Sequence, residues 1–386
     1  MSIQFLQQSP AFMHNKSNPE KCILCGRCLE VCPIFKVTGN EAHSPRGKAF
    51  LLDHYLENDI RRKSAVQLAE LCAGCKRCLD VCPQKLNLPL RIARLKSTSP
   101  DWRSWIWSRV LQAGAKVLPT FKNAGALIPA GLPVLRQALT APVHAPSLLR
   151  PSRTARMENE RAVVFPGCVG RHFRPGLTQK AFQMLELLGY NVLETPEWEC
   201  CGYPLGSAGL FEQEQKAAEM NIRLWDTLGR PLVFVFCATC LDGLQASFGD
   251  FDDVCLNDFR QRVRSLTAYI AALEYEHDGT SGDVKLYWHE PCHGHGNSGI
   301  HLKNSLASVG LELSVLRKKC CGMGGSFSIQ HPGLSSSIAQ DFWENTSQDE
   351  NSMIITDCSG CLLQLEAFRP KNVFTAHWLD IVRTDA

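Results

Sequence analysis

The sequence lacks the segments that carry a chain into or through a membrane. Residues Met1 to Glu20 contain no uninterrupted apolar stretch like the centre of a signal peptide. No run of about 18 apolar residues occurs in the 386-residue chain, so no helix is predicted to span a membrane. We therefore expect a cytoplasmic protein whose contact with the inner face of the cell membrane is at most peripheral.

Motifs of nucleotide chemistry are absent as well. There is no Gly-x-Gly-x-x-Gly fingerprint and no Walker A loop. The glycine pair Gly324-Gly325 lies in a glycine-rich segment, but the segment has the spacing of neither motif. No ordered set of Ser, His and Asp indicates a hydrolytic triad. The chain has 41 basic and 38 acidic residues, and the resulting net charge of +3 is too small to indicate a nucleic-acid partner. The sequence thus offers no recognisable site for a flavin, a nicotinamide or an organic substrate.

Cysteine, in contrast, is abundant. The chain has 19 cysteines, and its 45% apolar and 20% charged residues indicate a globular protein with room for two or three domains. Disulfides in such number are typical of small secreted proteins, and nothing in this sequence indicates secretion. We therefore expect thiolates that bind metal.

Eight cysteines near the N-terminus form two copies of one spacing. Each copy is Cys-x-x-Cys-x-x-Cys-x-x-x-Cys-Pro, once from Cys22 to Pro33 and once from Cys72 to Pro83. This spacing is typical of two-cluster bacterial ferredoxins, in which the fourth cysteine of each motif binds the cluster of the other. The sequence therefore predicts two [4Fe–4S] cubane clusters, one on Cys22, Cys25, Cys28 and Cys82 and one on Cys72, Cys75, Cys78 and Cys32. A pair of zinc sites is the alternative, although zinc usually takes two Cys-x-x-Cys pairs.

The segment between these motifs, Thr38 to Leu71, is longer than a compact ferredoxin needs. Within it, Ala49–Glu57 and Ser64–Leu71 have helical patterning. We expect an all-helical variant of the ferredoxin domain over residues 1–96.

A basic linker is predicted over residues 97–160. From Arg91 to Arg156 the chain carries eleven Lys or Arg residues and one acid, Asp101. Three tryptophans lie in the same stretch: Trp102, Trp105 and Trp107. Basic side chains interleaved with tryptophan suit a membrane surface or a docking groove on a partner. The alternative is a proline-punctuated linker that ties the domains together through its apolar residues.

Ten further cysteines form a second pattern that occurs twice. Each copy consists of a lone Cys, an adjacent Cys-Cys-Gly and a Cys-x-x-Cys. The first copy is Cys168, Cys200, Cys201, Cys237 and Cys240, and the second is Cys292, Cys320, Cys321, Cys358 and Cys361. Matching cysteines are 292 − 168 = 124, 320 − 200 = 120 and 358 − 237 = 121 residues apart. Ten thiols in register indicate two soft-ligand metal pockets on a duplicated scaffold rather than ordinary core packing.

Short apolar strands and helices alternate from Arg161 onward. Strands are predicted at Ala162–Phe165, Asn191–Leu193, Leu232–Phe236, Val284–Trp288, Leu311–Val315 and Met353–Thr356. Helices are predicted at Gly176–Gly189, Phe211–Leu228, Leu302–Val309 and Ser335–Asn345. The pattern predicts an α/β fold with two βαβ half-domains, 161–280 and 281–386. Cysteines follow strand ends in both, where open α/β sheets place their sites, so we expect two homologous pockets that face each other across a pseudo-two-fold axis.

The chain resembles the iron–sulfur subunits that join a two-cluster ferredoxin to twin cysteine-rich (CCG) domains. Besides the cysteines, the resemblance rests on Arg46-Gly47, Cys-Cys-Gly-Tyr-Pro-Leu at 200–205 and His289-Glu-Pro-Cys-His293. The family includes the iron–sulfur subunits of anaerobic glycerol-3-phosphate dehydrogenase and of glycolate oxidase, lactate-oxidation counterparts, and the CCG-containing subunit of heterodisulfide reductase. The resemblance covers nearly the whole chain, but its motifs do not fix a substrate.

The resemblance implies further cofactors. In heterodisulfide reductase-type members, five cysteines of one CCG motif can hold a non-cubane [4Fe–4S] cluster, so both sets of five are candidates. Zinc is the alternative in one of them, because four of the five thiols also satisfy a tetrahedral zinc ion. Because the sequence has no dinucleotide fingerprint, we expect no FAD on this chain.

Three histidines lie around Cys292, namely His289, His293 and His295. We expect them to donate hydrogen bonds to cluster sulfurs, to relay protons, or to be ordinary buried residues. Cys255 fits no motif and is expected to be an ordinary cysteine.

These features predict a non-catalytic electron-transfer subunit of a membrane-associated respiratory flavoprotein dehydrogenase. Its FAD-containing partner would oxidise glycerol 3-phosphate, glycolate or lactate, and electrons would pass toward quinone. Two alternatives stay open: a heterodisulfide reductase-like subunit that cleaves a disulfide at a CCG cluster, and a metal-binding scaffold that anchors a dehydrogenase. The sequence specifies neither the substrate nor the direction of electron flow nor the oligomeric state.

Overall fold

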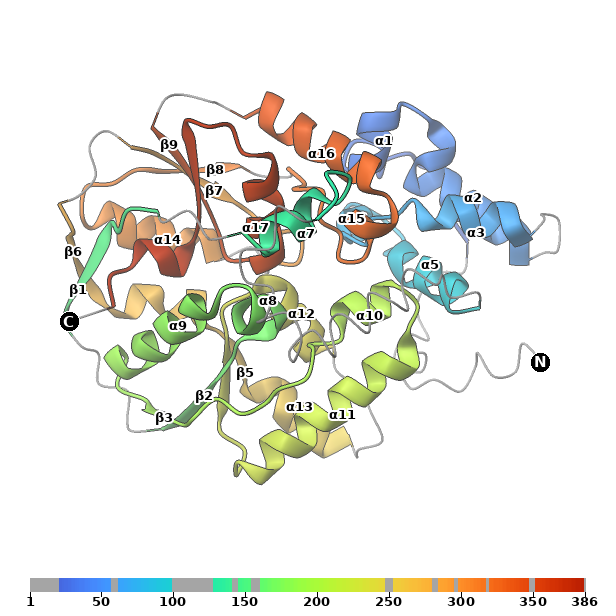
Figure 1. The fold of residues 1–386 in the computed structure, drawn as a ribbon. Helices are drawn as coiled ribbons and strands as arrows, with labels where there is room; N and C mark the ends of the chain where they lie inside the picture. The colour runs from blue at the N-terminus through green and yellow to red at the C-terminus, as the bar shows by residue number, and fades with distance from the viewer. Residues whose placement is uncertain are drawn as a thin grey trace.

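Three regions make up the structure: a helical N-terminal region and two α/β halves that lie one above the other (Figure 1). The computed structural model describes residues 21–56, 62–98, 128–140, 145–153, 160–246, 253–279, 284–294, 298–316, 319–346 and 351–384. The predicted tryptophan cluster of the linker and His295 lie outside these residues.

The N-terminal region is helical, as predicted. Its helices are α1 (Pro33–Thr38), α2 (Pro45–Leu56), α3 (Arg62–Glu70), α4 (Arg77–Asp80) and α5 (Leu88–Ser97). Helix α1 begins directly after the first cysteine motif, because Cys32 is its N-cap and Pro33 takes the first helical position, where no amide donor is needed. The fourth cysteine of the motif is therefore fixed at a helix terminus.

The first α/β half contains one parallel sheet. Its strands are β2 (Arg161–Phe165), β3 (Asn191–Val192), β4 (Leu232–Val235) and β5 (Val263–Ser265), in the order β3-β2-β4-β5. Its helices are α8 (Gly167–His172), α9 (Pro175–Leu187), α10 (Tyr203–Ser207), α11 (Phe211–Thr227), α12 (Ala238–Gln245) and α13 (Asp253–Arg262). The parallel pairing places the carboxyl ends of these strands at one edge of the sheet.

The second half repeats this strand order. Its strands are β7 (Lys285–His289), β8 (Leu313–Leu316), β9 (Ser352–Thr356) and β10 (Val373–His377), in the parallel order β8-β7-β9-β10. Its helices are α14 (Ser298–Ala307), α15 (Phe327–Gln330), α16 (Pro332–Glu344) and α17 (Ser359–Phe368). The lone cysteine and the Cys-x-x-Cys follow corresponding strands in both halves, namely β2 and β4 in the first and β7 and β9 in the second.

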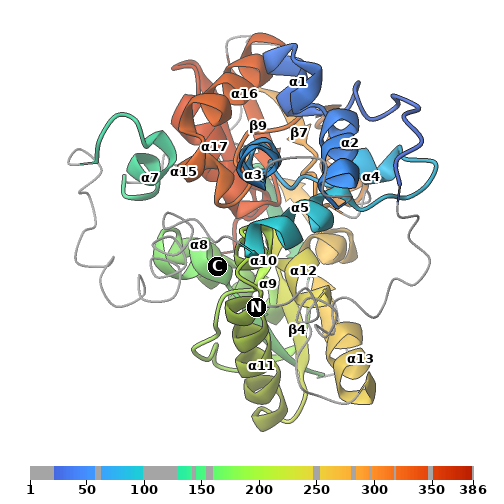
Figure 2. The same ribbon diagram turned by 90° about the vertical axis from the view of Figure 1, so that its right-hand side faces the viewer.

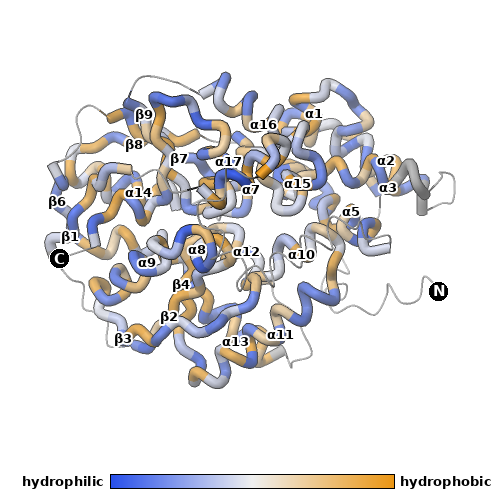
Figure 3. Tube along the Cα trace, in the orientation of Figure 1, coloured by the Kyte–Doolittle hydropathy of each residue, from blue (hydrophilic) through white to orange (hydrophobic). Residues whose placement is uncertain are grey.

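Elements outside the two sheets join the halves. Strands β1 (Leu149–Arg153) and β6 (Glu274–His277) pair in an antiparallel ribbon, and α7 (Pro133–Ala138) packs against α17. The buried strands of both halves belong to one continuous apolar core. The orange segments around β4 in Figure 3 are the part of it in the first half. The halves are therefore held together by shared apolar packing.

The helical region packs at the seam between the halves, with α1 against α16 of the second and α5 against α10 of the first (Figure 2). The approach of α5 is close: a Cβ at Gly209 would lie 2.6 Å from the amide nitrogen of Ser97. Gly209 has φ +80°, a conformation that glycine adopts without strain. The cysteine motifs of the helical region are thereby brought next to those of both halves.

Candidate metal centres

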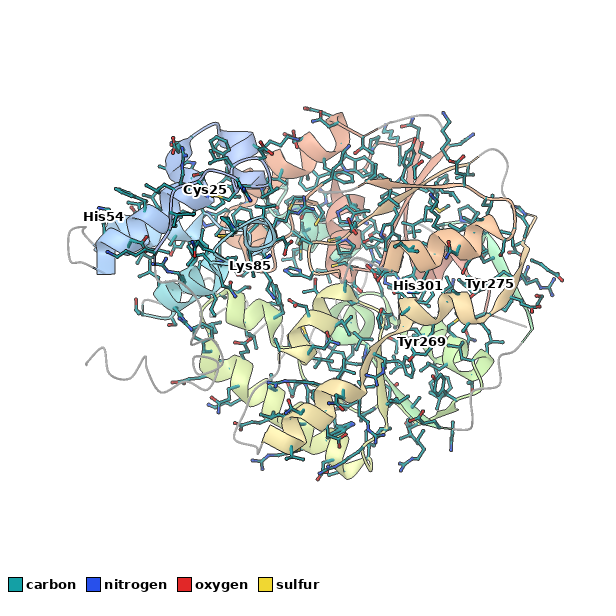
Figure 4. The ribbon with its side chains drawn as sticks, turned by 180° about the vertical axis from the view of Figure 1, so that it is seen from behind. Cys25, His54, Lys85, Tyr269, Tyr275 and His301 are labelled. Carbon is teal, nitrogen blue, oxygen red and sulfur yellow. The ribbon has the colours of Figure 1, made fainter. Side chains whose placement is uncertain are left out.

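A cavity of about 30 Å³ lies at the outer end of the helical region. Four thiols predicted to bind the first cubane line it, together with Cys78: Cys22, Cys25, Cys28 and Cys82. Cys25 is exposed, and Figure 4 shows it on the helical region. This site is therefore open to a partner at the surface.

A second cavity, of about 20 Å³, lies deeper in the same region. Its thiols are Cys32, Cys72, Cys75 and Cys78. The fourth cysteine of the second motif, Cys82, thus lines the outer cavity, and that of the first motif, Cys32, lines the inner one. Burial raises the pKa of Cys78 and of Cys75 above the ordinary thiol value.

A third cavity, of about 110 Å³, lies between the two α/β halves. Nine of the ten CCG cysteines line it, together with Cys75: Cys168, Cys201, Cys237, Cys240, Cys292, Cys320, Cys321, Cys358 and Cys361. Cys200, the tenth, is buried beside Cys201. Because Cys75 also lines the second cavity, the inner ferredoxin site and the CCG sites adjoin.

The Cys-x-x-Cys pairs lie where strands turn into helices. Cys237 is the N-cap of α12 after β4, and Cys358 is the N-cap of α17 after β9. A helix N-terminus carries a partial positive charge, which favours thiolates. The geometry thus suits metal ligands in both halves.

The two Cys-Cys-Gly turns depend on their glycines. Gly202 and Gly322 have φ values of +87° and +92°, which L-amino acids with side chains rarely adopt. A Cβ at Gly322 would also lie 2.6 Å from the carbonyl oxygen of Ser335. A glycine is therefore needed at the turn that follows each cysteine pair.

Burial dominates the electrostatics of these thiols. It raises the pKa of Cys168 and of Cys292 to about 12, and that of Cys28 to about 11. Hydrogen bonds from neighbouring thiols lower the pKa of Cys201 instead. The thiols with a raised pKa keep their protons until a metal replaces them. Three compact cavities with sulfur donors from several motifs fit iron–sulfur clusters.

Polar side chains around the third cavity connect all three regions. The Oγ1 of Thr239 lies 3.2 Å from the Sγ of Cys358 and 3.4 Å from the Nδ1 of His293. The His293 and Tyr203 rings lie 4.3 Å apart, and the Tyr203 hydroxyl donates to the Gly74 carbonyl over 2.8 Å. Thr239 lies within the Cys-x-x-Cys of the first copy, at a position that the cysteine spacing alone does not mark.

Arg77 is a buried cation that the cysteine spacing does not predict either. Its side chain donates to the Lys319 carbonyl oxygen over 2.6 Å, and the residue is 9% exposed. Burial opposes its charge, but the nearby thiols of Cys320 and Cys75 raise its pKa overall. The sequence marks Arg77 only by its position, directly before the third cysteine of the second motif. Arg27 holds the same position in the first motif.

His289 lies at the end of β7, 1% exposed. A ring nitrogen of His289 and the sulfurs of Cys321 and Cys361 all lie within 4.8 Å of one another. Burial, reinforced by the charge of Arg77, lowers the pKa of His289 to about 3, so the ring is neutral. Cys255, on α13, lines none of the three cavities.

Comparison with protein families agrees with this arrangement. The model of the 4Fe-4S dicluster domain matches residues 18–86, and the model of the cysteine-rich domain matches residues 162–245 and 286–366. The chain is therefore an iron–sulfur protein in which a ferredoxin-type dicluster domain precedes two cysteine-rich CCG domains.

Two of the relatives that the chain resembles are named as subunits of oxidoreductases. The chain is 24% identical to the glycolate oxidase iron–sulfur subunit of Escherichia coli K12, over 98% of this chain and 96% of the relative. It is 22% identical to a subunit of anaerobic glycerol-3-phosphate dehydrogenase from the same strain, over 91% and 95%. A lactate utilization protein A of Shouchella clausii is 26% identical over 52% of this chain and 88% of the relative.

The described helices include none with the length and apolar character needed to cross a bilayer.

Proposed function

We propose that this chain is the electron-transfer subunit of a dehydrogenase complex. Its partner is an FAD-containing subunit that oxidises glycolate, lactate or glycerol 3-phosphate, and the electrons pass toward quinone. The observation that carries the proposal is the row of three adjoining thiol-lined cavities, from exposed Cys25 to the seam between the halves. The names of the relatives support the class of partner.

In this proposal each cavity has its own ligands. The outer cavity binds a cubane through Cys22, Cys25, Cys28 and Cys82, and the inner one binds a cubane through Cys72, Cys75, Cys78 and Cys32. The two CCG sets bind non-cubane clusters, or zinc in one of them, on scaffolds that arose by duplication. When bound, iron–sulfur clusters accept and release single electrons.

The side chains around the outer site suit a docking surface. Ile23 and Leu24 lie between Cys22 and Cys25 in the sequence and are 56% and 47% exposed. Apolar side chains around an exposed cysteine favour close contact with a protein partner. Of the inner cysteines, Cys32 is buried and the other three are partly buried, so water has less access to them than to Cys25.

The test uses the complex of this chain with its flavoprotein partner. Replacing Cys200-Cys201 or Cys320-Cys321 by serine should abolish quinone reduction and leave the partner's dye-linked oxidation intact. Cys255→Ser, outside every motif, is the control and should have no effect. The proposal fails if the double substitutions leave quinone reduction unchanged, or if this chain alone oxidises the substrate.

Metal content tests the cofactors separately. Two cubanes require about eight irons, and two occupied CCG sites about eight more. If the anaerobically purified chain contains about eight irons and one or two zincs, clusters are present in the ferredoxin domain alone. That result would contradict the proposal of clusters in the CCG sites.

A second candidate, disulfide reduction at a CCG site, is supported by the room in the third cavity. Its 110 Å³ exceeds the two ferredoxin cavities together, which measure about 30 and 20 Å³. Val134, Leu135 and Ala138 of α7 give it an apolar wall. Turnover of an organic disulfide by the isolated chain with a reduced dye would support this function over the first.

Peripheral attachment to the inner face of the membrane, through the basic linker, belongs to the same proposal. Each basic residue near anionic lipid is worth about 1 kcal/mol, so salt should release the complex from membranes. Attachment that resists salt would point to a packing role for the linker.

A further inference from the structure

The two α/β halves differ at one strand-end position. His289 ends β7 and Phe165 ends β2. They correspond, because 289 − 165 = 124, the same offset that relates Cys292 to Cys168. Phe165 packs against Trp198, with ring centroids 5.5 Å apart, and has no atom that can bind a metal. The second half therefore has a nitrogen donor where the first half has a hydrocarbon ring.

The surroundings of His289 hold its ring in one orientation. The Nδ1 lies 3.3 Å from the hydroxyl oxygen of Thr356. The Phe342 ring meets it edge to face, at a centroid distance of 5.5 Å. The Nε2 is buried and has no hydrogen-bond partner among the described residues. A buried polar atom without a partner is costly, and an ion is one explanation for it.

We propose that His289 is a nitrogen ligand of the metal in the second CCG site, next to Cys321 and Cys361. The Sγ atoms of these cysteines lie 3.0 Å apart, and all three side chains are buried. Metal-binding histidines commonly have an oxygen partner on the other ring nitrogen, and Thr356 provides one here. The inference rests on the proposed function only in requiring that the CCG cysteines bind metal.

The inference makes the two CCG sites chemically different. The first site has sulfur ligands alone, whereas the second has mixed nitrogen and sulfur ligands, a combination that both zinc and cluster iron accept. If the second site holds a cluster in which His289 takes the place of one thiolate on iron, the neutral imidazole raises the reduction potential of that cluster above that of an all-thiolate cluster. It would then draw electrons from the all-sulfur site.

The test compares two buried histidines in the full, anaerobically reconstituted chain. His289→Phe introduces the residue found in the first half. His377→Phe is the matched control, because His377 is also buried at a strand end but its Nε2 lies 3.1 Å from the Phe236 carbonyl oxygen. The chain is labelled with 15N-histidine, and zinc and iron are counted.

If the site holds a cluster, pulsed EPR should show a strong 15N coupling in the wild type and the control that His289→Phe lacks. If it holds zinc, His289→Phe should lower zinc affinity about tenfold or more, and the control should not. Equal couplings, or equal zinc affinities, in all three proteins would overturn the inference. His289→Gln serves if the phenylalanine variant does not fold. Loss of all CCG metal from the wild type would instead defeat the proposed function.

Discussion

The guanidinium of Arg77 donates a 2.6 Å hydrogen bond to the carbonyl oxygen of Lys319, the residue before the Cys320-Cys321 pair. Arg77 itself lies between Cys75 and Cys78, two thiols of the inner ferredoxin cavity. One buried positive charge therefore lies between the inner cubane site and the second CCG site.

Arg77→Gln should lower the reduction potentials of both adjoining centres, because a reduced cluster gains negative charge that Arg77 stabilises. A unit charge roughly 10 Å away is worth about 1.7 kcal/mol at an effective dielectric constant of about 20. For one electron this corresponds to about 70 mV. EPR-monitored redox titration of Arg77→Gln and of the wild type measures this shift in reduction potential, with Arg27→Gln as a control.

Arg27 is the matched control for this prediction, since it has the same place in the first motif but is exposed. Water screens an exposed charge, so Arg27→Gln should move the outer cubane potential much less. Equal shifts in both variants would show that burial of Arg77 is irrelevant to its effect.

The contrast between Arg77 and Arg27 also shows where sequence reasoning ends. Both precede the third cysteine of the same motif, and local spacing assigns them the same environment. Only the packing of the second motif against residues more than 200 positions away buries Arg77. Contacts of that range leave no periodic pattern in the sequence.

The strands and the cysteine register could be predicted, because apolar runs and fixed spacings are local properties. Strands such as Ala162–Phe165 and Met353–Thr356 were predicted within a residue or two of their bounds. Strands β5 and β10 were missed for physical reasons. The first is three residues long with one buried side chain, and the second buries the polar residues Thr375 and His377.

A second prediction concerns the fourth cysteine of each ferredoxin motif, which we propose binds the cluster of the other motif. Cys82→Ser should remove the cluster bound by Cys22, Cys25 and Cys28, with a loss of about four irons, and spare the inner cluster. Cys32→Ser should do the reverse, because Cys32 lines the inner cavity. Iron analysis with EPR of each anaerobic variant checks this. Loss of the inner cluster alone in Cys82→Ser would show that each motif binds its own cluster.

The ion pair between Arg174 and Glu366 links the two halves and supports a third prediction. The pair is 2.6 Å long with side chains 5% and 3% exposed, and Gln137 of α7 also donates to Glu366. Glu366→Gln leaves the cation buried without its counter-charge, so we expect a loss of about 3–5 kcal/mol in the free energy of unfolding. Urea unfolding of the anaerobic protein measures it.

The exposed pair of Arg230 and Asp226 is the control, with side chains 45% and 56% exposed. Asp226→Asn should cost about 0–1 kcal/mol. A comparably small loss in Glu366→Gln would mean that the seam between the halves does not depend on the buried pair.

Glu214 on α11 should make stability depend on pH. Its carboxyl lies against the turn after Cys200-Cys201, where a Cβ at Gly206 would be 2.4 Å from its Oε1. Burial, together with the charge of Cys201, raises its pKa from 4.5 to about 8. Between these values the folded chain holds a proton that the unfolded chain has released, so this carboxyl destabilises the fold as pH rises through that range. The slope is at most about 1.4 kcal/mol per pH unit, and less where water reaches the carboxyl.

Glu214→Gln removes this titration while keeping the shape of the side chain. The variant should gain stability over the wild type as pH rises from about 5 to 8, because it has no carboxyl to ionise against the buried turn. Urea midpoints of the anaerobic protein across that range measure the difference. Glu212→Gln, an exposed position on the same helix, is the control and should follow the wild type at every pH. A wild-type curve that runs parallel to that of Glu214→Gln would show that Glu214 is ionised in the folded protein throughout this range.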